Sequence, residues 1–352
     1  MKLLLITVRS DFGGGPRHID QLVKELPPNY EIYMAYPEDG EPYANQWKND
    51  KRVKETLFIP YRKFSFMVLW ILYKFIKKNG IEIIHSHGNG AGLYSRLLKL
   101  IGCKAKVVHT FHGISDEYST EFKYLLSLVV GRLLEPLADI YIAVSNGEKA
   151  LGIKRGFCTE RNCEVVYNGI ADERLQNIGY DSNTLVTISR YDYQKNMSLC
   201  LDIVRLMKDD GVKFLWVGDG DDFATMKDIV DKEHLPVDMV GFQTKPMEFL
   251  VRSAIYLSTS RFEGLPYALI EASSVGLPIV ATDVKGNNEV AINDENGLTF
   301  NTAEEGAAAL RRILSNKQEY ERMSINSRKL FEERFTIDVM IDDLIKVYKA
   351  LV

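Results

Sequence analysis

Short apolar runs alternate along the chain with longer stretches that have the spacing of amphipathic helices. In the first half, the runs predict strands at Leu3–Val8, Glu31–Ala35, Ile81–Ser86, Lys106–Thr110, Ile140–Val144 and Cys163–Tyr167. The pattern then restarts and predicts strands at Leu185–Ser189, Lys213–Val217, Val237–Val240, Ile255–Ser258, Ile279–Ala281 and Gly297–Phe300. Because strands and helices alternate, each set should form a doubly wound parallel sheet. The sequence therefore predicts an α/β protein with two Rossmann-like domains.

A polar stretch, Asp172–Asn183, separates the two sets of strands. It contains Gly179 and has no sustained periodicity, which is typical of a linker. The chain has 352 residues, of which 46% are hydrophobic and 26% charged, so each half is large enough to bury a core. We therefore expect a first domain at residues 1–171, an interdomain hinge in the polar stretch, and a second domain at residues 184–335.

The net charge of −4 hides an asymmetry between the two halves of the chain. Residues 1–170 carry 23 Lys and Arg against 18 Asp and Glu, whereas residues 171–352 carry 21 against 30. The first half is therefore better suited to an anionic partner. We expect no nucleic-acid partner.

The first residues, MKLLLITVRS, are expected to form a strand because they are too few for a signal peptide and run directly into a Gly-rich loop. No apolar run reaches the roughly 18–20 residues of a membrane-spanning helix. The four cysteines form no CxxC pair and lack zinc-ligand spacing, so we expect structural thiols. These features favour a cytoplasmic protein, soluble or held at the inner face of the membrane.

The segment Arg261–Ala272, RFEGLPYALIEA, places the carboxylates of Glu263 and Glu271 eight positions apart around a Gly-Leu-Pro turn. The turn would present backbone N–H groups at a helix N-terminus, where phosphate binds, while both carboxylates can accept hydrogen bonds from hydroxyl groups. A sugar nucleotide offers both kinds of group. The alternatives are a surface helix that starts near a Glu, and acid/base hydrolysis by two carboxylates that flank one scissile bond.

Seven segments of the chain resemble, in this order, those of the retaining glycosyltransferases of family 4. They are a Gly-rich first loop, TFHG, VSNG, VYNGI, SRYDYQKN, WVGDG, and RFEGLPYALIEA with its E-x7-E signature. The resemblance implies the GT-B fold, in which two Rossmann-like domains face a central cleft and the last helix, here Thr336–Val352, returns to the first domain. It also implies transfer of a sugar, with retention, from a nucleoside-diphosphate sugar, most often a UDP-sugar, to an acceptor hydroxyl.

The same resemblance assigns roles around the two carboxylates. It implies that Glu271 binds the ribose hydroxyls and that Glu263 lies near the donor sugar. It implies backbone contacts to the donor from Gly264, Leu265, Pro266 and Tyr267. The acceptor implied is a saccharide or a lipid-linked molecule in the synthesis of a cell-surface polysaccharide or glycolipid.

Arg190 and Lys195, in SRYDYQKN, follow the first predicted strand of the second domain and open its helix. Arg offers a rigid fork of donors and Lys a mobile point charge, so together they can neutralise a departing diphosphate. This pair resembles the Arg/Lys diphosphate clamp of the family. The alternative is a solvated cationic helix start, but cations are unfavourable at a helix N-terminus, and their presence there suggests a bound anion.

The first loop contains Gly13, Gly14 and Gly15 between a predicted strand and a helix expected to begin near His18. Glycines let the backbone approach a phosphate closely, and the helix terminus adds a favourable dipole. We expect Gly14 and Gly15 to contact the donor phosphate or the acceptor. A purely structural turn is the alternative, and dinucleotide binding is disfavoured because the loop lacks G-x-G-x-x-G spacing.

His112, in TFHG, follows an apolar strand, where α/β sheets place ligand-binding groups. A structural role is the alternative, but the family resemblance favours an active-site donor near the sugar or its acceptor. His85 and His87, in IIHSHGNG, should lie on one face of a strand, either packed or lining a cleft. They resemble a metal-binding pair only by spacing, and the sequence shows no third ligand.

Asp219-Gly220-Asp221 resembles the D-x-D metal motif of the other glycosyltransferase fold, GT-A. It lies between a predicted strand and helix, where Gly turns and Asp caps are expected on structural grounds. We therefore expect no metal or other cofactor, with Arg190 and Lys195 in place of a divalent ion. Phe242 matches the family region near the base, although an ordinary loop or core aromatic is an equal alternative.

The segment Tyr61–Gly80 contains an unbroken apolar run flanked by Arg and Lys residues. Apolar residues all round a helix are typical of a buried helix, here with a basic rim. The alternative is peripheral contact with an anionic membrane through the apolar run and its flanking cations.

These features together predict a GT-B glycosyltransferase. A nucleotide-sugar 2-epimerase shares the architecture, and a non-catalytic nucleotide-sugar-binding subunit is a third hypothesis. The co-occurrence of Arg190, Lys195, Glu263, Glu271 and His112 argues against a decayed site. The identity of the sugar and of the acceptor depends on variable loops that the motifs do not determine.

Overall fold

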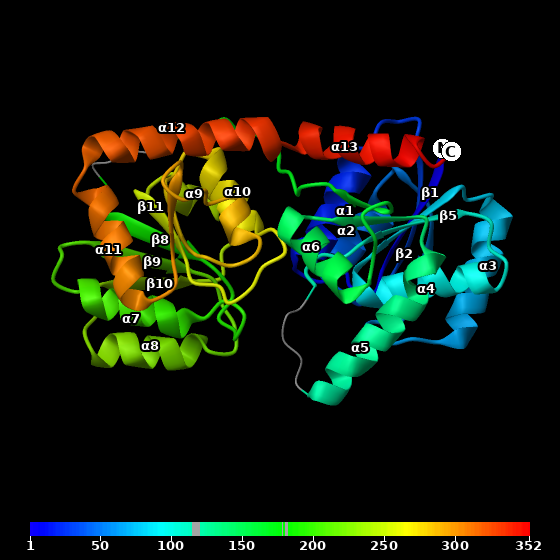
Figure 1. Cartoon of the computed structure of the whole chain (residues 1–352), viewed down its shortest axis with the longest axis horizontal. Coiled ribbons are helices and arrows are strands. Elements are labelled where there is room, and N and C mark those ends of the chain that lie inside the picture. The colour runs from blue at the N-terminus through cyan, green and yellow to red at the C-terminus, as the bar shows by residue number, and fades with distance from the viewer. Residues whose placement is uncertain (115–119, 178, 180–181) are drawn as a thin grey trace. The chain divides into compact units, whose positions relative to one another are not determined.

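The chain folds into two compact units, which a computed structural model describes for residues 1–114, 120–177, 179 and 182–352 (Figure 1). The first unit comprises Met1–Asn168 with Ile337–Val352, and the second comprises Gly169–Thr336. Each unit has its own parallel sheet and its own hydrophobic core.

The first unit is built on a seven-stranded parallel sheet with the order β3-β2-β1-β4-β5-β6-β7. Its strands are β1 (Lys2–Thr7), β2 (Glu31–Tyr36), β3 (Val53–Phe58), β4 (Ile83–His87), β5 (Lys106–Thr110), β6 (Ile140–Ala143) and β7 (Cys163–Val165). Its helices are α1 (Gly14–Glu25), α2 (Tyr43–Asn49), α3 (Phe66–Asn79), α4 (Gly88–Leu100), α5 (Glu121–Leu134), η1 (Glu135–Leu137), α6 (Asn146–Arg155) and α13 (Ile337–Lys349).

Strand β1 shows why this sheet is covered on both faces. Leu3 and Leu5 point into a core shared with α1 and α13, whereas Leu4 and Ile6 point into a core shared with α3 and α4. Successive side chains of a strand face opposite sides, so a strand buried on both faces must be continuously apolar. The Leu-rich start of the chain therefore specifies a central strand.

The second unit is built on a six-stranded parallel sheet with the order β10-β9-β8-β11-β12-β13. Its strands are β8 (Thr184–Ile188), β9 (Lys213–Val217), β10 (Val237–Gly241), β11 (Ile255–Ser258), β12 (Ile279–Thr282) and β13 (Gly297–Phe300). Its helices are α7 (Met197–Met207), α8 (Phe223–Lys232), α9 (Met247–Leu250), α10 (Tyr267–Ser274), η2 (Asn287–Glu289), α11 (Ala303–Leu314) and α12 (Lys317–Arg334).

The strand order creates one switch point in each sheet. In the first unit, β1 pairs with both β2 and β4, and in the second unit β8 pairs with both β9 and β11. The loops after β1 and β4, and those after β8 and β11, therefore leave their sheets in different directions. Doubly wound sheets bind ligands at the carboxyl ends of the strands at such points.

The predicted doubly wound architecture is confirmed, and the structure adds one strand that the sequence did not predict. Strand β3 lies at the sheet edge, and most of its residues are partly or fully exposed. Its polar residues, Lys54 and Glu55, interrupt the apolar run that marks the buried strands. Helix α1 also starts earlier than predicted, at Gly14, because Pro16 is well tolerated in a first turn.

Helix α3 combines features of both interpretations of Tyr61–Gly80. One face, with Val68, Leu72 and Phe75 among others, is buried in the core. The other face leaves Phe66, Met67, Trp70 and Ile71 exposed. Within the described part of the chain, no helix has both the length and the apolar character that crossing a membrane requires.

Candidate active site

The loops after β8 and β11 meet at the switch point of the second sheet and form a small pocket. It is lined by Thr187, Ile188, Ser189, Lys195, Tyr256, Ser258, Thr259, Ser260, Pro266, Ala268 and Leu269. The clamp segment follows β8, and the carboxylate segment follows β11. Two segments that are far apart in the sequence are thus brought together.

Lys195 and Glu263 form an ion pair at this pocket. Lys195 Nζ donates to Glu263 Oε1 over 2.6 Å, and the side chains are only 18% and 8% exposed. Burial of both partners reduces screening by water and salt, so their charges interact more strongly than those of a surface pair. The sequence placed these residues near the same donor molecule but did not predict that they contact each other.

Gln194 connects this ion pair to Arg190. Its Nε2 donates to Glu263 Oε2 over 3.2 Å and to the backbone oxygen of Phe262 over 3.0 Å. Its Oε1 accepts from Arg190 Nη2 over 3.1 Å, and Arg190 also pairs with Asp192 at 3.0 Å. The two predicted clamp residues and Glu263 therefore belong to one polar network. Gln194 was not among the residues predicted from the sequence, although it lies within SRYDYQKN.

Glu271 lies inside α10, which starts at Tyr267 directly after Pro266. Both Glu263 and Glu271 are buried, as are the side chains of Leu265 and Tyr267. The pKa of the Tyr256 phenol is raised by burial, and the charges of Glu271 and Glu263 raise it further. The two carboxylates therefore act electrostatically on one pocket side chain.

The turn before α10 requires a glycine in a neighbouring loop. Gly286 has a φ of 85°, and a β-carbon on it would lie 2.5 Å from the backbone oxygen of Gly264. Only glycine combines that conformation with so close an approach. Gly286 was not predicted from the sequence, in which it is only one of several loop glycines.

The Asp219-Gly220-Asp221 segment packs against the clamp segment through its backbone. The backbone oxygen of Asp219 accepts from the Tyr191 N–H over 3.0 Å, and Asp219 Oδ1 accepts from the Gly220 N–H over 2.7 Å. These contacts are those of turn residues. Phe242 follows β10 directly, and its side chain is 52% exposed.

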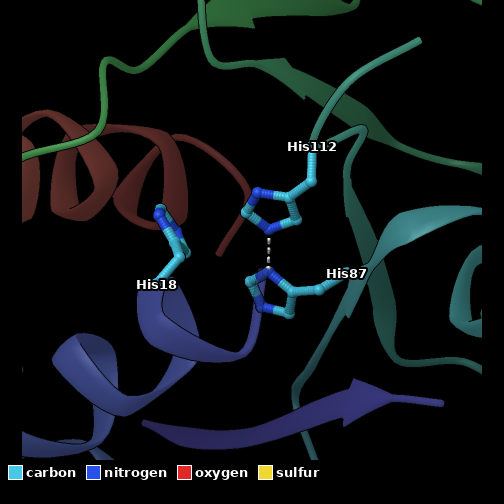
Figure 2. Close-up of side chains that lie close together, drawn as sticks. All are labelled: His18, His87 and His112. Atoms are coloured by element: carbon cyan, nitrogen blue, oxygen red, sulfur yellow. Dashed lines mark hydrogen bonds between the residues drawn. The ribbon is translucent and has the colours of Figure 1, made fainter. Parts of the chain in front are cut away.

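Three histidines gather in the first unit at the switch point between β1 and β4. Figure 2 shows His18 from α1, His87 from the end of β4 and His112 from the segment after β5. His87 Nδ1 and His112 Nε2 are 2.9 Å apart and share a hydrogen bond. A β-carbon on Gly15, in the first turn of α1, would lie 3.7 Å from the His112 ring, so Gly15 and His112 are neighbours. Gly14 is the first residue of α1.

The backbone at His112 is strained and is held by a buried carboxylate. His112 has a φ of 60°, which is uncommon for a residue with a side chain and often marks a functional site. Glu148 accepts from the N–H groups of Gly113 and Ile114 over 2.5 and 2.8 Å, and from that of Val144 over 2.9 Å. Glu148 therefore positions the His112 turn, a role that the sequence analysis missed.

Burial keeps the three imidazoles neutral. It lowers the pKa of His18 to about 4, although the hydrogen bond to Asn168 opposes the shift. It lowers the pKa of His87 and of His112 well below the usual value, and neighbouring histidines add to the effect. At neutral pH, these rings can therefore donate a hydrogen bond from one nitrogen and accept one at the other.

His85 and His87 pack against each other on one face of β4, as expected, with ring centroids 4.0 Å apart, but His85 is not free to bind a metal. Its two nitrogens are engaged by Tyr348 Oη at 2.6 Å and Thr110 Oγ1 at 2.7 Å. His87 instead groups with His18 and His112. The sequence showed no third ligand because these three histidines lie far apart along the chain.

Comparison with known proteins identifies both halves of the chain. Residues 12–174 match the model of Glycosyltransferase Family 4, and residues 171–330 match that of Glycosyl transferases group 1. The amylovoran biosynthesis glycosyltransferase AmsD of Erwinia amylovora is 28% identical over 90% of each chain. An Escherichia coli UDP-Gal:alpha-D-GlcNAc-diphosphoundecaprenol alpha-1,3-galactosyltransferase is 26% identical over 80% of this chain and 78% of its own.

A solved structure with a similar fold is that of HepE from Anabaena in complex with UDP and glucose. It has 16% sequence identity and a TM-score of 0.84, with 99% of this chain and 100% of that chain covered. This likeness supports the fold assignment, and the matched models and relatives support the activity. The chain is therefore a glycosyltransferase of the GT-B fold and of the family-4-like kind.

Proposed function

We propose that this enzyme transfers a sugar, with retention, from a UDP-sugar to an acceptor hydroxyl in the synthesis of a cell-surface polysaccharide or glycolipid. The observation that carries the proposal is the polar network at the pocket of the second unit, in which the largely buried Lys195–Glu263 ion pair is connected through Gln194 to the exposed Arg190. It combines cations for a diphosphate with a carboxylate for sugar hydroxyls. The E-x7-E signature is the basis for retention.

The relatives support the donor and the acceptor class. HepE was solved with UDP and glucose, and the galactosyltransferase relative is named for a UDP-sugar donor and a diphosphoundecaprenol acceptor. The capsular polysaccharide glycosyltransferase CapH of Staphylococcus aureus is a further relative, with 23% identity. These names favour a UDP-sugar and an acceptor on a lipid carrier or a growing saccharide.

In the proposed mechanism, the charge of Lys195 is redistributed when the donor binds. Without donor, its ammonium group pairs with Glu263. A diphosphate in the pocket would add a second anion for Lys195 and for Arg190. Both cations would then stabilise the negative charge that develops as the nucleoside diphosphate departs. We assign the ribose to Glu271, the sugar or its acceptor to His112, and the donor phosphate or the acceptor to Gly14 and Gly15. Phe242 is proposed to lie near the base.

Product formation distinguishes transfer from its alternatives. We expect purified enzyme to release UDP from its cognate UDP-sugar quickly only when the acceptor is added. A 2-epimerase would act on the donor without any acceptor, and a non-catalytic subunit would bind donor without turnover. The measurement is UDP release across a panel of UDP-sugars, each with and without polyprenyl-diphosphate saccharides. Acceptor-independent turnover would contradict the proposed function.

We expect the transferase activity to survive chelation. The proposed reason is that Arg190 and Lys195 neutralise the diphosphate without a divalent ion. Activity should be equal with and without EDTA, or higher with EDTA if a contaminating metal inhibits. Loss of activity on chelation, restored by Mn²⁺ or Mg²⁺, would instead indicate that Asp219 and Asp221 are metal ligands.

We also propose that the exposed face of α3 contacts an anionic membrane that holds a lipid-linked acceptor. Phe66, Met67 and Trp70 are 79%, 71% and 52% exposed, and Lys77 and Lys78 lie in the last turn of the same helix. Exposed apolar side chains can enter the headgroup layer while nearby cations attract anionic lipid. This surface belongs to Tyr61–Gly80, the segment for which membrane contact was the alternative interpretation of the sequence.

Flotation with liposomes tests this membrane contact. We expect binding to vesicles that contain anionic lipid, weaker binding at high salt because of screening, and less binding by Trp70→Ser. Ile325→Ser is the matched control, because Ile325 is 69% exposed on α12 in the other unit. Equal binding to neutral vesicles, or no binding at all, would contradict the proposal.

A further inference from the structure

His18, His87 and His112 meet two geometric requirements of a metal site. Each ring offers one nitrogen, Nδ1 or Nε2, and these three nitrogens all lie within 4.8 Å of one another. Figure 2 shows the three rings gathered together. The ring centroids of His18 lie 5.5 Å from His87 and 4.9 Å from His112. Within the described residues, this is the one group of three or more His, Cys, Asp and Glu side chains with such geometry.

Two of these rings carry a buried nitrogen that has no hydrogen-bond partner in the described structure. They are Nε2 of His18 and Nε2 of His87. The amide oxygen of Asn168 lies 3.2 Å from His18 Nδ1 and accepts its proton, so the neutral His18 ring keeps a lone pair on Nε2. Buried polar atoms without a partner are uncommon in folded proteins, and a bound ion is one explanation for the unpartnered Nε2 of His18.

We propose that His18, His87 and His112 form a binding site for one Zn²⁺ ion, and that Zn²⁺ bound there inhibits the enzyme. The inhibitory part rests on the proposed function, because the ion would occupy the imidazole of His112 that is assigned to the sugar or its acceptor. The binding part rests only on the three histidines.

The distances fit a zinc ion after small movements. Zn–N bonds of about 2.0–2.1 Å in a tetrahedral site separate the ligand nitrogens by roughly 3.4 Å. His87 Nδ1 and His112 Nε2 are now 2.9 Å apart and would move slightly apart. One nitrogen of His18, which lies within 4.8 Å of one nitrogen of each of the other two rings, would move closer to them. The proton shared by His87 and His112 would pass to the other nitrogen of the ring that carries it.

The donor set also fits zinc. Imidazole suits Zn²⁺ and Co²⁺, whereas Mg²⁺ and Ca²⁺ prefer oxygen ligands. Three histidines leave one position for water, and His112 is less buried than the other two, so this position can face solvent. Asn168 would act as the outer-shell acceptor that orients His18, as partners of zinc-bound histidines commonly do.

Titration with Co²⁺ tests the site without reference to activity. Untagged protein, stripped with chelator, should bind one Co²⁺ per chain with the strong visible absorption of low-coordinate cobalt, and Zn²⁺ should remove this absorption. Affinity should fall by about a hundredfold or more in His18→Gln and in His87→Gln, since loss of an outer-shell partner alone costs about 10–100-fold. Asn168→Ala removes only an outer-shell partner, so its Co²⁺ affinity should fall by the smaller factor of about 10–100. Thermal unfolding of each stripped variant checks that it is folded.

His234→Asn is the matched control, because His234 is exposed and lies outside the group. Asn also tolerates its φ of 53°. This variant should bind Co²⁺ as the wild type does. If wild-type protein with Co²⁺ shows no visible absorption, or only the weak absorption of octahedral cobalt, the proposed site is wrong. It is also wrong if His234→Asn and His18→Gln lose equal Co²⁺ affinity. A metal-binding site without transferase activity would contradict the proposed function but leave the site in place.

Inhibition is measured in the same variants. One equivalent of Zn²⁺ should lower wild-type turnover at least tenfold, with recovery on EDTA. The ratio of turnover with and without Zn²⁺ should approach one in His18→Gln. Stoichiometric Zn²⁺ binding with unchanged turnover would overturn the inhibitory part of the proposal.

Discussion

Replacing Lys195 with alanine should lower kcat/KM by about a hundredfold or more. A hydrogen bond to a charged group contributes about 1.5–3 kcal/mol, and the upper part of that range corresponds to this loss of transition-state stabilisation. The side chain of Lys195 is only 18% exposed, so water can stabilise the charge of the diphosphate only poorly when Lys195 is removed. The expected effect is largest on the step in which the diphosphate departs.

The ion pair with Glu263 adds a second consequence. Without Lys195, the buried Glu263 carboxylate keeps the hydrogen bond from Gln194 but loses its cation. The variant should therefore also be less stable, because a buried charge without its counter-charge is unfavourable. Thermal unfolding of Lys195→Ala, with and without UDP, separates this effect from the loss of catalysis.

Arg190→Ala should lower kcat/KM to a similar extent with less effect on stability, since the Arg190 side chain is 61% exposed. Lys232→Ala is the control: Lys232 also forms an ion pair, with Asp228, but on the exposed surface of α8. Steady-state kinetics at saturating acceptor give the comparison. Near-normal turnover in a folded Lys195→Ala protein, or an equal loss in Lys232→Ala, would remove the diphosphate clamp from the mechanism.

The sequence predicted the sheets better than it predicted the site. Buried parallel strands are continuously apolar, so β1 and β12 are visible as runs of hydrophobic residues. Edge strand β3 was missed because Lys54 and Glu55 face a partly solvated environment. Strand β10, which is also partly exposed, was predicted because a single polar residue, Asp238, interrupts its apolar residues, whereas β3 has two adjacent charged residues.

Contacts between residues far apart in the chain were the part that the sequence could not provide. Lys195 and Glu263 are 68 positions apart, and their pairing follows from the order of β8 and β11 in the sheet. His18 was treated only as the start of a helix, because nothing local links it to His87 and His112. The supporting roles of Gln194 and Glu148 were missed for the same reason.

The two glutamates of the E-x7-E segment should respond differently to substitution. We propose that Glu271 accepts hydrogen bonds from the ribose, which is present in both the donor and free UDP. Glu271→Gln and Glu271→Ala should therefore weaken binding of both ligands, by about tenfold or more for the loss of one charged hydrogen bond. The loss should be seen in KM as well as in calorimetry.

Glu263→Ala should lower turnover but leave the affinity for free UDP intact or slightly higher. We propose that Glu263 contacts the transferred sugar, which UDP lacks, so its loss should affect mainly the transition state. Its removal also frees Lys195 from the 2.6 Å ion pair, which makes the ammonium group more available to a diphosphate. For this reason, the UDP affinity of Glu263→Ala should be equal to or higher than that of the wild type, and not lower.

Calorimetry with UDP, run beside steady-state kinetics, distinguishes the two roles. Glu333→Ala is the matched control, because Glu333 also lies on a helix of the second unit but is 56% exposed and pairs only weakly with Lys329. Glu263→Ala should retain wild-type or higher UDP affinity with reduced kcat, Glu271→Ala should lose affinity for UDP and donor alike, and Glu333→Ala should change neither. Equal losses of UDP affinity in the two site variants would show that these roles are divided wrongly. Unchanged affinity and turnover in both would exclude the pair from the active site, because two buried carboxylates that contact a substrate cannot both be removed without effect on its binding or its reaction.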